Sequence, residues 1–115
     1  MIFMKPKILQ TLGMDVLSGT GSPIRVLEIS RNLAKRGFPV FVTSLNRQKS
    51  NHMHDTIDGV EIFRTPFMNI RTEEAKFAIN TKRLYSLNKK IIKENKIDII
   101  HSHLISATFS SFFLK

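Results

Sequence analysis

Two histidines, His101 and His103, directly follow the mostly apolar residues 97–100. Such a segment predicts a β-strand, in which side chains two residues apart point to the same face. An imidazole can hydrogen-bond a hydroxyl group, and near neutral pH it can also stabilise charge that develops during a reaction. The spacing therefore predicts a polar site for a ligand at the carboxyl end of this strand.

Two other interpretations of these histidines stay open. One or both side chains could simply satisfy backbone groups where the strand ends. A metal site would need further ligands, and the remaining histidines of the chain are His52 and His54. These lie in a polar segment without fixed geometry, so we expect no metal.

The second candidate site is a loop that contains Gly19, Thr20, Gly21 and Ser22 and precedes a helical pattern. The first turn of a helix presents free N–H groups and a partial positive charge, which together attract anions. We therefore expect these four residues to bind substrate, although a loop of this kind can also be only a turn. A dinucleotide-binding fingerprint needs glycine where Ile24 stands, and no Gly-Lys-Ser/Thr triplet occurs.

The elements that position this loop form a βαβ unit. The sequence predicts an apolar strand over 8–12, then an amphipathic helix that ends at Gly37, and then a second strand over 40–42. The helix places Ile24, Leu27, Leu33 and Ala34 on its apolar side. Parallel strands need such a crossover, and ligands bind at the carboxyl ends of the strands.

The rest of the chain repeats the pattern. Residues 46–55 predict a surface loop, the pair Asp58-Gly59 predicts a turn, and residues 60–64 predict a short strand. Thr72 is the expected N-cap of a long helix that runs to Asn95. Its expected buried stripe is Phe77, Leu84, Leu87 and Ile91. The fold class is therefore α/β, a Rossmann-like parallel sheet with flanking helices.

Length and composition limit the function classes. The chain has 115 residues, 42% of them hydrophobic, and no cysteine, so we expect one domain without disulfides. Its apolar start is too short for a signal peptide, so we expect none, and no apolar run approaches the roughly 20 residues that would span a bilayer. We expect a cytoplasmic protein, peripheral on the inner membrane face if the basic helix described below contacts lipid.

Charge favours anionic partners. Lys and Arg number 18 against 9 Asp and Glu, which gives a formal net charge of +9. Many of these cations lie on the helix predicted over 72–96: Lys76, Lys82, Arg83, Lys89, Lys90, Lys93 and Lys96. The helix could lie on an anionic membrane surface or could carry a solvated face. No series of aromatic residues accompanies the charge, so nucleic acid is not expected.

Three stretches together resemble the N-terminal domain of GT-B glycosyltransferases of family 4, the "group 1" transferases. The loop and helix over 19–40 are similar to the family's glycine doublet and the helix behind it. The third-strand segment of the family is similar to Asp58-Gly-Val-Glu-Ile-Phe-Arg-Thr-Pro66. The family's His-x-His at the end of the fourth strand is similar to Ile97-Asp-Ile-Ile-His-Ser-His103.

The resemblance implies the acceptor-side half of a retaining, metal-independent transferase. Its co-substrate would be a nucleotide-sugar, bound by a C-terminal domain that is absent here, and its acceptor a glycan or a lipid-linked molecule. It implies that His103 faces the cleft between the two domains as the catalytic residue. His101 and the loop Gly19, Thr20, Gly21 and Ser22 would then bind substrate.

Residues 104–114 predict a further, very apolar helix that nothing in the chain is left to cover. We therefore expect 1–115 to be a single, incomplete domain of a longer protein, inactive alone. Two alternatives remain: a subunit that pairs with a separately encoded donor domain, and a non-catalytic basic module that binds phosphorylated ligands or an anionic membrane.

Overall fold

The computed structural model describes residues 5–12, 21–46 and 53–103. Over these ranges the chain forms strands and helices in the order β1 (Ile8–Leu12), α1 (Gly21–Lys35), β2 (Val40–Asn46), β3 (His54–Ile57), β4 (Val60–Pro66), α2 (Glu73–Asn95) and β5 (Ile99–His103). The predicted α/β class is confirmed.

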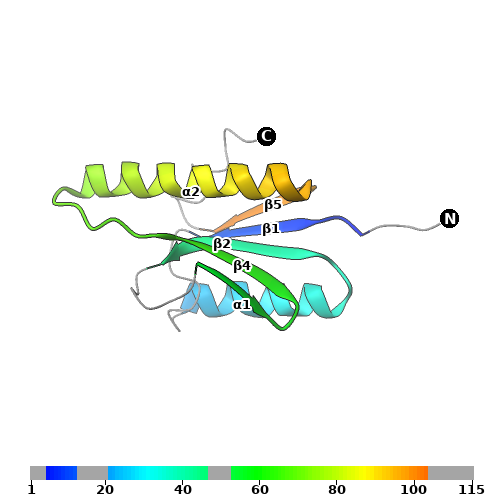
Figure 1. Ribbon diagram of the computed structural model, residues 1–115. Helices are drawn as coiled ribbons and strands as arrows, with labels where there is room; N and C mark the ends of the chain where they lie inside the picture. The colour runs from blue at the N-terminus through cyan, green and yellow to red at the C-terminus, as the bar shows by residue number, and fades with distance from the viewer. Residues whose placement is uncertain (1–4, 13–20, 47–52, 104–115) are drawn as a thin grey trace.

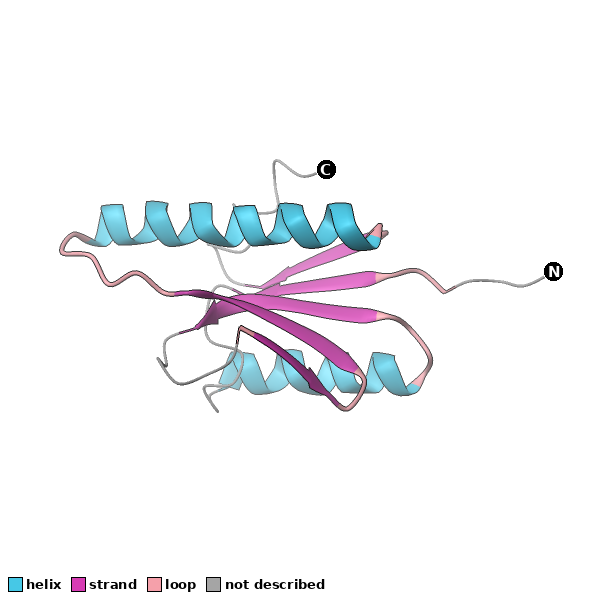
Figure 2. Ribbon diagram, in the orientation of Figure 1, coloured by secondary structure: helices cyan, strands magenta, loops and turns pink. Residues whose placement is uncertain are grey.

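The strands make one sheet in the order β3-β4-β2-β1-β5. β4, β2, β1 and β5 are parallel, and the short edge strand β3 runs antiparallel to β4. Helix α1 covers one face of the sheet and α2 the other, as Figures 1 and 2 show. The crossover through α1 leads from β1 to β2 on one side of β1, and the crossover through α2 leads from β4 to β5 on its other side. The boundary between β1 and β5 is therefore the topological switch point of the sheet.

Helix α1 returns the chain from β1 to β2, as predicted. Gly37 ends it with a φ of +90°, a left-handed conformation that residues with a Cβ rarely adopt. Its buried face differs from the expected one, because Val26 is fully buried while Ile24 is 44% exposed. Leu27, Leu33 and Ala34 do pack on the core, so the buried face is turned toward Val26 and away from Ile24.

A β-hairpin replaces part of the predicted surface loop. Asp58 and Gly59 adopt φ values of 50° and 82°, the two positive angles that a tight type I′ turn requires. The turn was expected, but the strand before it was not, because β3 contains polar residues and one face of it is exposed. Asn46 likewise belongs to the end of β2 rather than to a loop.

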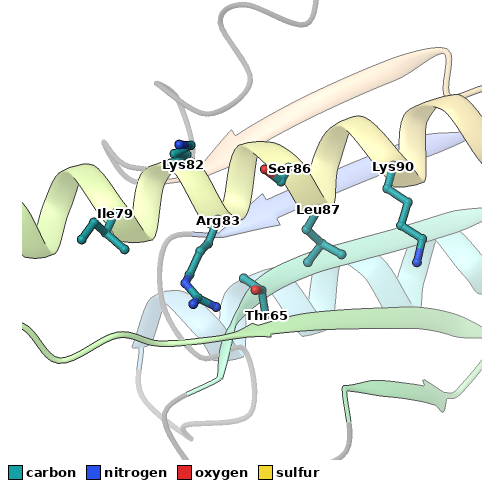
Figure 3. A pocket seen from close by; sticks show the side chains of 7 residues that line it. All are labelled: Thr65, Ile79, Lys82, Arg83, Ser86, Leu87 and Lys90. Carbon is teal, nitrogen blue, oxygen red and sulfur yellow. The ribbon is translucent and has the colours of Figure 1, made fainter.

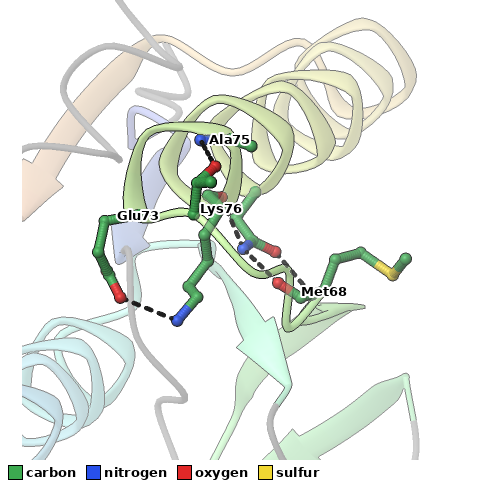
Figure 4. Close-up of polar contacts among 6 residues, drawn as sticks. Met68, Glu73, Ala75 and Lys76 are labelled. Carbon is green, nitrogen blue, oxygen red and sulfur yellow. Dashed lines mark hydrogen bonds and ion pairs between the residues drawn. The ribbon is translucent and has the colours of Figure 1, made fainter.

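Helix α2 begins where the sequence predicts. The Thr72 hydroxyl accepts a hydrogen bond from the N–H of Ala75 at 3.2 Å, and Glu73 lies in the first turn beside Lys76 (Figure 4). The helix ends at Lys96, whose left-handed φ of 54° closes the last turn.

The predicted buried stripe of α2 is partly wrong. Leu84 and Ile91 are buried, but Phe77 is 44% exposed and Leu87 is only half-buried. Two asparagines take the remaining buried positions, Asn80 and Asn88. A hydrophobic pattern missed them because buried amides are rare, and each is buried here with hydrogen-bond partners.

The two sheet faces have different interiors. The α1 face is apolar, with Leu12, Val40, Val42, Val60 and Ile62 in its core. On the α2 face, the Asn88 amide donates to the Thr11 hydroxyl at 3.1 Å and accepts from the Thr43 hydroxyl. This network ties α2 to β1 and β2, and so fixes the helix over the centre of the sheet.

Helix α2 is longer than the strands it covers. Its 23 residues span about 34 Å, whereas the 7 residues of β4 span about 23 Å. The surplus lies at the N-terminal end of α2, which extends past the carboxyl edge of the sheet (Figure 1). Phe77 and Ile79, in the N-terminal part of α2, are exposed.

Candidate functional site

The predicted site lies at the switch point, where β1 and β5 end side by side. Leu12 at the end of β1 is the register partner of His103 at the end of β5. Helix α1 runs antiparallel to the strands, so its first turn lies at the same carboxyl edge (Figure 1). The expectation that the first strand and the histidine-bearing strand end at a common edge is confirmed.

His101 and His103 lie on one face of β5, as their spacing predicts. Their ring centroids are 4.1 Å apart and the rings are tilted by 43°. This is the face that α1 covers, because His101 and His103 are the register partners of Gln10 and Leu12, and Leu12 packs in the core beneath α1. The two imidazoles therefore lie on the same side of the sheet as α1.

A buried glutamine orients His103. Gln10, which is 1% exposed, has its Oε1 atom 2.7 Å from Nε2 of His103. The amide oxygen only accepts hydrogen bonds, so Nε2 carries the proton and donates it. In a neutral ring, Nδ1 is then an acceptor, and among the described residues it has no hydrogen-bond partner.

The electrostatic surroundings favour the neutral form of His103. Burial lowers the pKa of this side chain below its usual value of 6.5, and the neighbouring His101 lowers it further. Both effects act against a positive charge on the ring. At neutral pH, His103 is therefore an uncharged group with a fixed donor at Nε2 and an open acceptor at Nδ1.

The glycine-bearing segment is described only in part. Gly21 and Ser22 form the start of α1 at the carboxyl edge, and Gly19 and Thr20 lie outside the described residues. No acidic residue occupies the first turn of α1, so no carboxylate there opposes the partial positive charge of the helix end. The position and polarity of this turn suit an anion.

The histidines do not gather into one cluster. His54 lies on β3, at the opposite edge of the sheet from β5, where it stacks on Phe63 and contacts Glu61. It cannot share a ligand with His101 and His103, and His52 lies outside the described residues. Within the described ranges, no group of three or more His, Asp or Glu side chains is arranged to hold a metal ion.

A groove of about 560 Å³ opens on the other face, between α2 and the end of β4 (Figure 3). It is lined by Thr65, Ile79, Lys82, Arg83, Ser86, Leu87 and Lys90. Arg83, Leu87 and Lys90 extend from α2 toward β4, and Thr65 lies below them. The sequence pattern indicated these cations only as part of a basic helix, and no groove was predicted.

Two buried polar residues near the carboxyl edge were also missed. Gln10 lies within the strand predicted as apolar, and its only signal in the sequence is that it is polar there; the structure shows that it is the register partner of His101. Arg64, 3% exposed, forms an ion pair with Asp55 of β3. Because β3 was not predicted, its carboxylate could not be matched to Arg64 from the sequence.

Comparison with known proteins assigns the fold. The chain matches Glycosyltransferase Family 4 over residues 19–114. Its structure is similar to sucrose-phosphate synthase from Thermosynechococcus elongatus, with a TM-score of 0.76 and 13% sequence identity. That match covers 94% of this chain and 30% of the other. No curated protein matches by sequence.

The described helices include none that is long and apolar enough to cross a membrane. The family match covers most of the chain, and it includes the predicted glycine-loop and His-x-His segments. The structural match covers 94% of this chain, and so extends over its mostly parallel sheet and the helices on both faces. The chain therefore belongs to Glycosyltransferase Family 4 and has the fold of the N-terminal domain of a GT-B glycosyltransferase.

Proposed function

We propose that this chain is the acceptor-side domain of a retaining glycosyltransferase, which transfers a sugar from a nucleotide-sugar to a glycan or a lipid-linked acceptor. The observation that carries the proposal is the arrangement at the switch point. There, His103 lies at the end of β5, held by Gln10 of β1, at the edge where α1 begins. Open α/β sheets bind their ligands at such a point.

His103 is the proposed catalytic residue. With Nε2 bonded to Gln10, Nδ1 is available to accept a hydrogen bond from a sugar hydroxyl. A neutral imidazole suits this role, because a second proton would remove the acceptor. His101, whose ring lies beside that of His103, would contact the same substrate.

Gly19, Thr20, Gly21 and Ser22 are the proposed contacts to the phosphates of the donor. The first turn of α1 offers N–H groups, and its partial positive charge would stabilise the negative charge that grows on the departing diphosphate. Transfer also needs a domain that binds the nucleotide, on the same polypeptide or on a partner subunit. The chain spans 30% of the length of the matched synthase, which leaves room for such a domain in a protein of that size.

We further propose that the protein is cytoplasmic and that the N-terminal part of α2 contacts an anionic membrane surface, from which a lipid-linked acceptor would be taken. Phe77 and Ile79 of this helix, and Met68, which precedes it, are exposed. Basic residues follow along the same helix, and apolar side chains beside cations suit the interface of an anionic bilayer. A basic module that binds phosphorylated ligands or membranes without catalysis is the alternative.

The test is a transfer assay on the product of the full reading frame. Nucleotide-sugars are supplied singly with lipid and glycan extracts, and release of nucleoside diphosphate is measured with and without acceptor. The proposal predicts acceptor-dependent release, and NMR of the product should show the donor's anomeric configuration retained. Binding to anionic vesicles without any sugar transfer would favour the non-catalytic module instead.

A further inference from the structure

The groove between α2 and β4 has no part in the proposed transfer chemistry. It lies on the α2 face of the sheet, whereas the His103 side chain lies on the α1 face. Its volume of about 560 Å³ falls within the range of sites for small molecules, roughly 300–1,000 Å³. A groove of this volume can admit a small molecule.

The charge of the groove is positive and locally uncompensated. Lys82, Arg83 and Lys90 line it, and among the described residues none of the three forms an ion pair. Near the start of α2, Glu73 pairs with Lys76 and not with a cation of the groove. An anion entering the groove would therefore meet cations that have no competing carboxylate partner.

The groove also offers neutral contacts. The Thr65 hydroxyl lies at the end of β4 below Arg83, and Leu87 extends between Arg83 and Lys90 (Figure 3). A guanidinium group matches two phosphate oxygens at once, and a lysine adds a point charge. The apolar side chain of Leu87 does not stabilise a bare anion, but it can pack on the organic part of an ester.

We propose that this groove binds a phosphate ester. Arg83 and Lys90 hold the phosphate oxygens, the Thr65 hydroxyl donates a hydrogen bond, and Leu87 packs on the carbon skeleton. The inference goes beyond the proposed transferase function, because binding here needs neither the donor domain nor His103. Either idea can fail without the other.

The experiment is an NMR titration of the ¹⁵N-labelled chain with glucose 6-phosphate, and with glucose as the neutral probe. We expect saturable shifts of the Thr65 amide and of amides over residues 79–90 with the phosphate ester, and none with glucose. Exchanging both cations, as Arg83→Gln with Lys90→Gln, should weaken binding tenfold or more. Thr65→Val should weaken it by a smaller factor and leave the charge unchanged.

The matched control is the double variant Arg25→Gln with Lys35→Gln. It removes the same charge from exposed positions of α1, on the opposite face of the sheet. Equal weakening by the two double variants would overturn the proposal, because attraction would then come from net charge alone. So would equal shifts with glucose, or shifts that avoid the groove. Dispersed amide spectra of each variant establish that it is folded.

Two further arms identify the source of the phosphate. Inorganic phosphate should compete with glucose 6-phosphate but bind more weakly, because it lacks the part that packs on Leu87. Phosphatidylglycerol vesicles that displace glucose 6-phosphate from the groove would identify a lipid headgroup as a ligand, and vesicles that leave it bound would identify a soluble ester. Vesicle binding without any binding of the soluble ester would contradict a discrete groove site.

Discussion

Gln10 and His103 lie on neighbouring parallel strands, and the glutamine Oε1 accepts a hydrogen bond from the histidine Nε2 across 2.7 Å. Gln10 is almost fully buried, so its side chain is held by the surrounding sheet. His103 has one ring nitrogen bound to it and the other available for a ligand. Gln10 therefore acts as a positioning residue that sets which nitrogen of His103 carries the proton.

Replacing Gln10 by Leu should allow the neutral His103 ring to adopt either tautomer. We expect ¹⁵N shifts of the wild-type ring to report a proton on Nε2, and those of Gln10→Leu to report a mixture of the two neutral forms. The leucine keeps the side chain buried but cannot accept a hydrogen bond. Identical ring shifts in both proteins would mean that Gln10 does not select the tautomer.

His103 should titrate below pH 6.5, because burial and then His101 lower its pKa. His101→Gln removes the smaller cause, so the midpoint should rise in that variant but stay below 6.5.

In the unfolded chain the pKa returns to about 6.5, so the unfolded state binds more protons as the pH falls. The free energy of unfolding should therefore fall below about pH 6.5 and level off under the folded-state pKa. A His103→Gln variant should lack this component in urea unfolding curves measured between pH 5 and 8.

Asn88→Ala should destabilise the fold by about 2–4 kcal/mol in urea unfolding. The change leaves the buried hydroxyls of Thr11 and Thr43 without their amide partner, and it also removes packing atoms. Lys89→Ala, one residue on and exposed, is the control and should change stability by less than about 0.5 kcal/mol. Similar losses from both would show that the network contributes little.

Asn80→Ala should loosen the segment between β4 and α2. The Asn80 side chain accepts from the Met68 N–H at 2.8 Å and donates to the Met68 carbonyl at 2.9 Å. Without these bonds, amide hydrogen exchange at Met68 should speed up by tenfold or more. Ile79→Ser alters an exposed neighbour and should leave that exchange rate unchanged. If Met68 exchanges equally fast in the wild type, the segment is not held by Asn80.

The sequence predicted the parallel sheet because its strands are apolar and are separated by helix-length crossovers. The common edge of β1 and β5 followed from that topology, and the shared face of His101 and His103 from strand geometry. Those features depend on local pattern, which a single sequence carries. The site residues themselves remain predictions.

The features that escaped prediction depend on pairing between distant residues. β3 is polar on its exposed face, and it pairs with β4 in a hairpin that also brings Asp55 to Arg64. Asn88 occupies a core position because its side-chain amide forms hydrogen bonds with two threonines of the sheet. Gln10 gains its role only through the register that brings β5 beside β1.

The most direct test of the account compares sugar transfer by His103→Ala and His54→Ala in the full reading-frame product. His54 is exposed at the far edge of the sheet, so its removal should leave turnover unchanged. His103→Ala removes the proposed contact to the reacting sugars, and we predict a loss of about a hundredfold or more in kcat/KM, corresponding to ~2.7 kcal/mol. Equal activity of the two variants, with wild-type turnover in both, would contradict a site at the ends of β1 and β5.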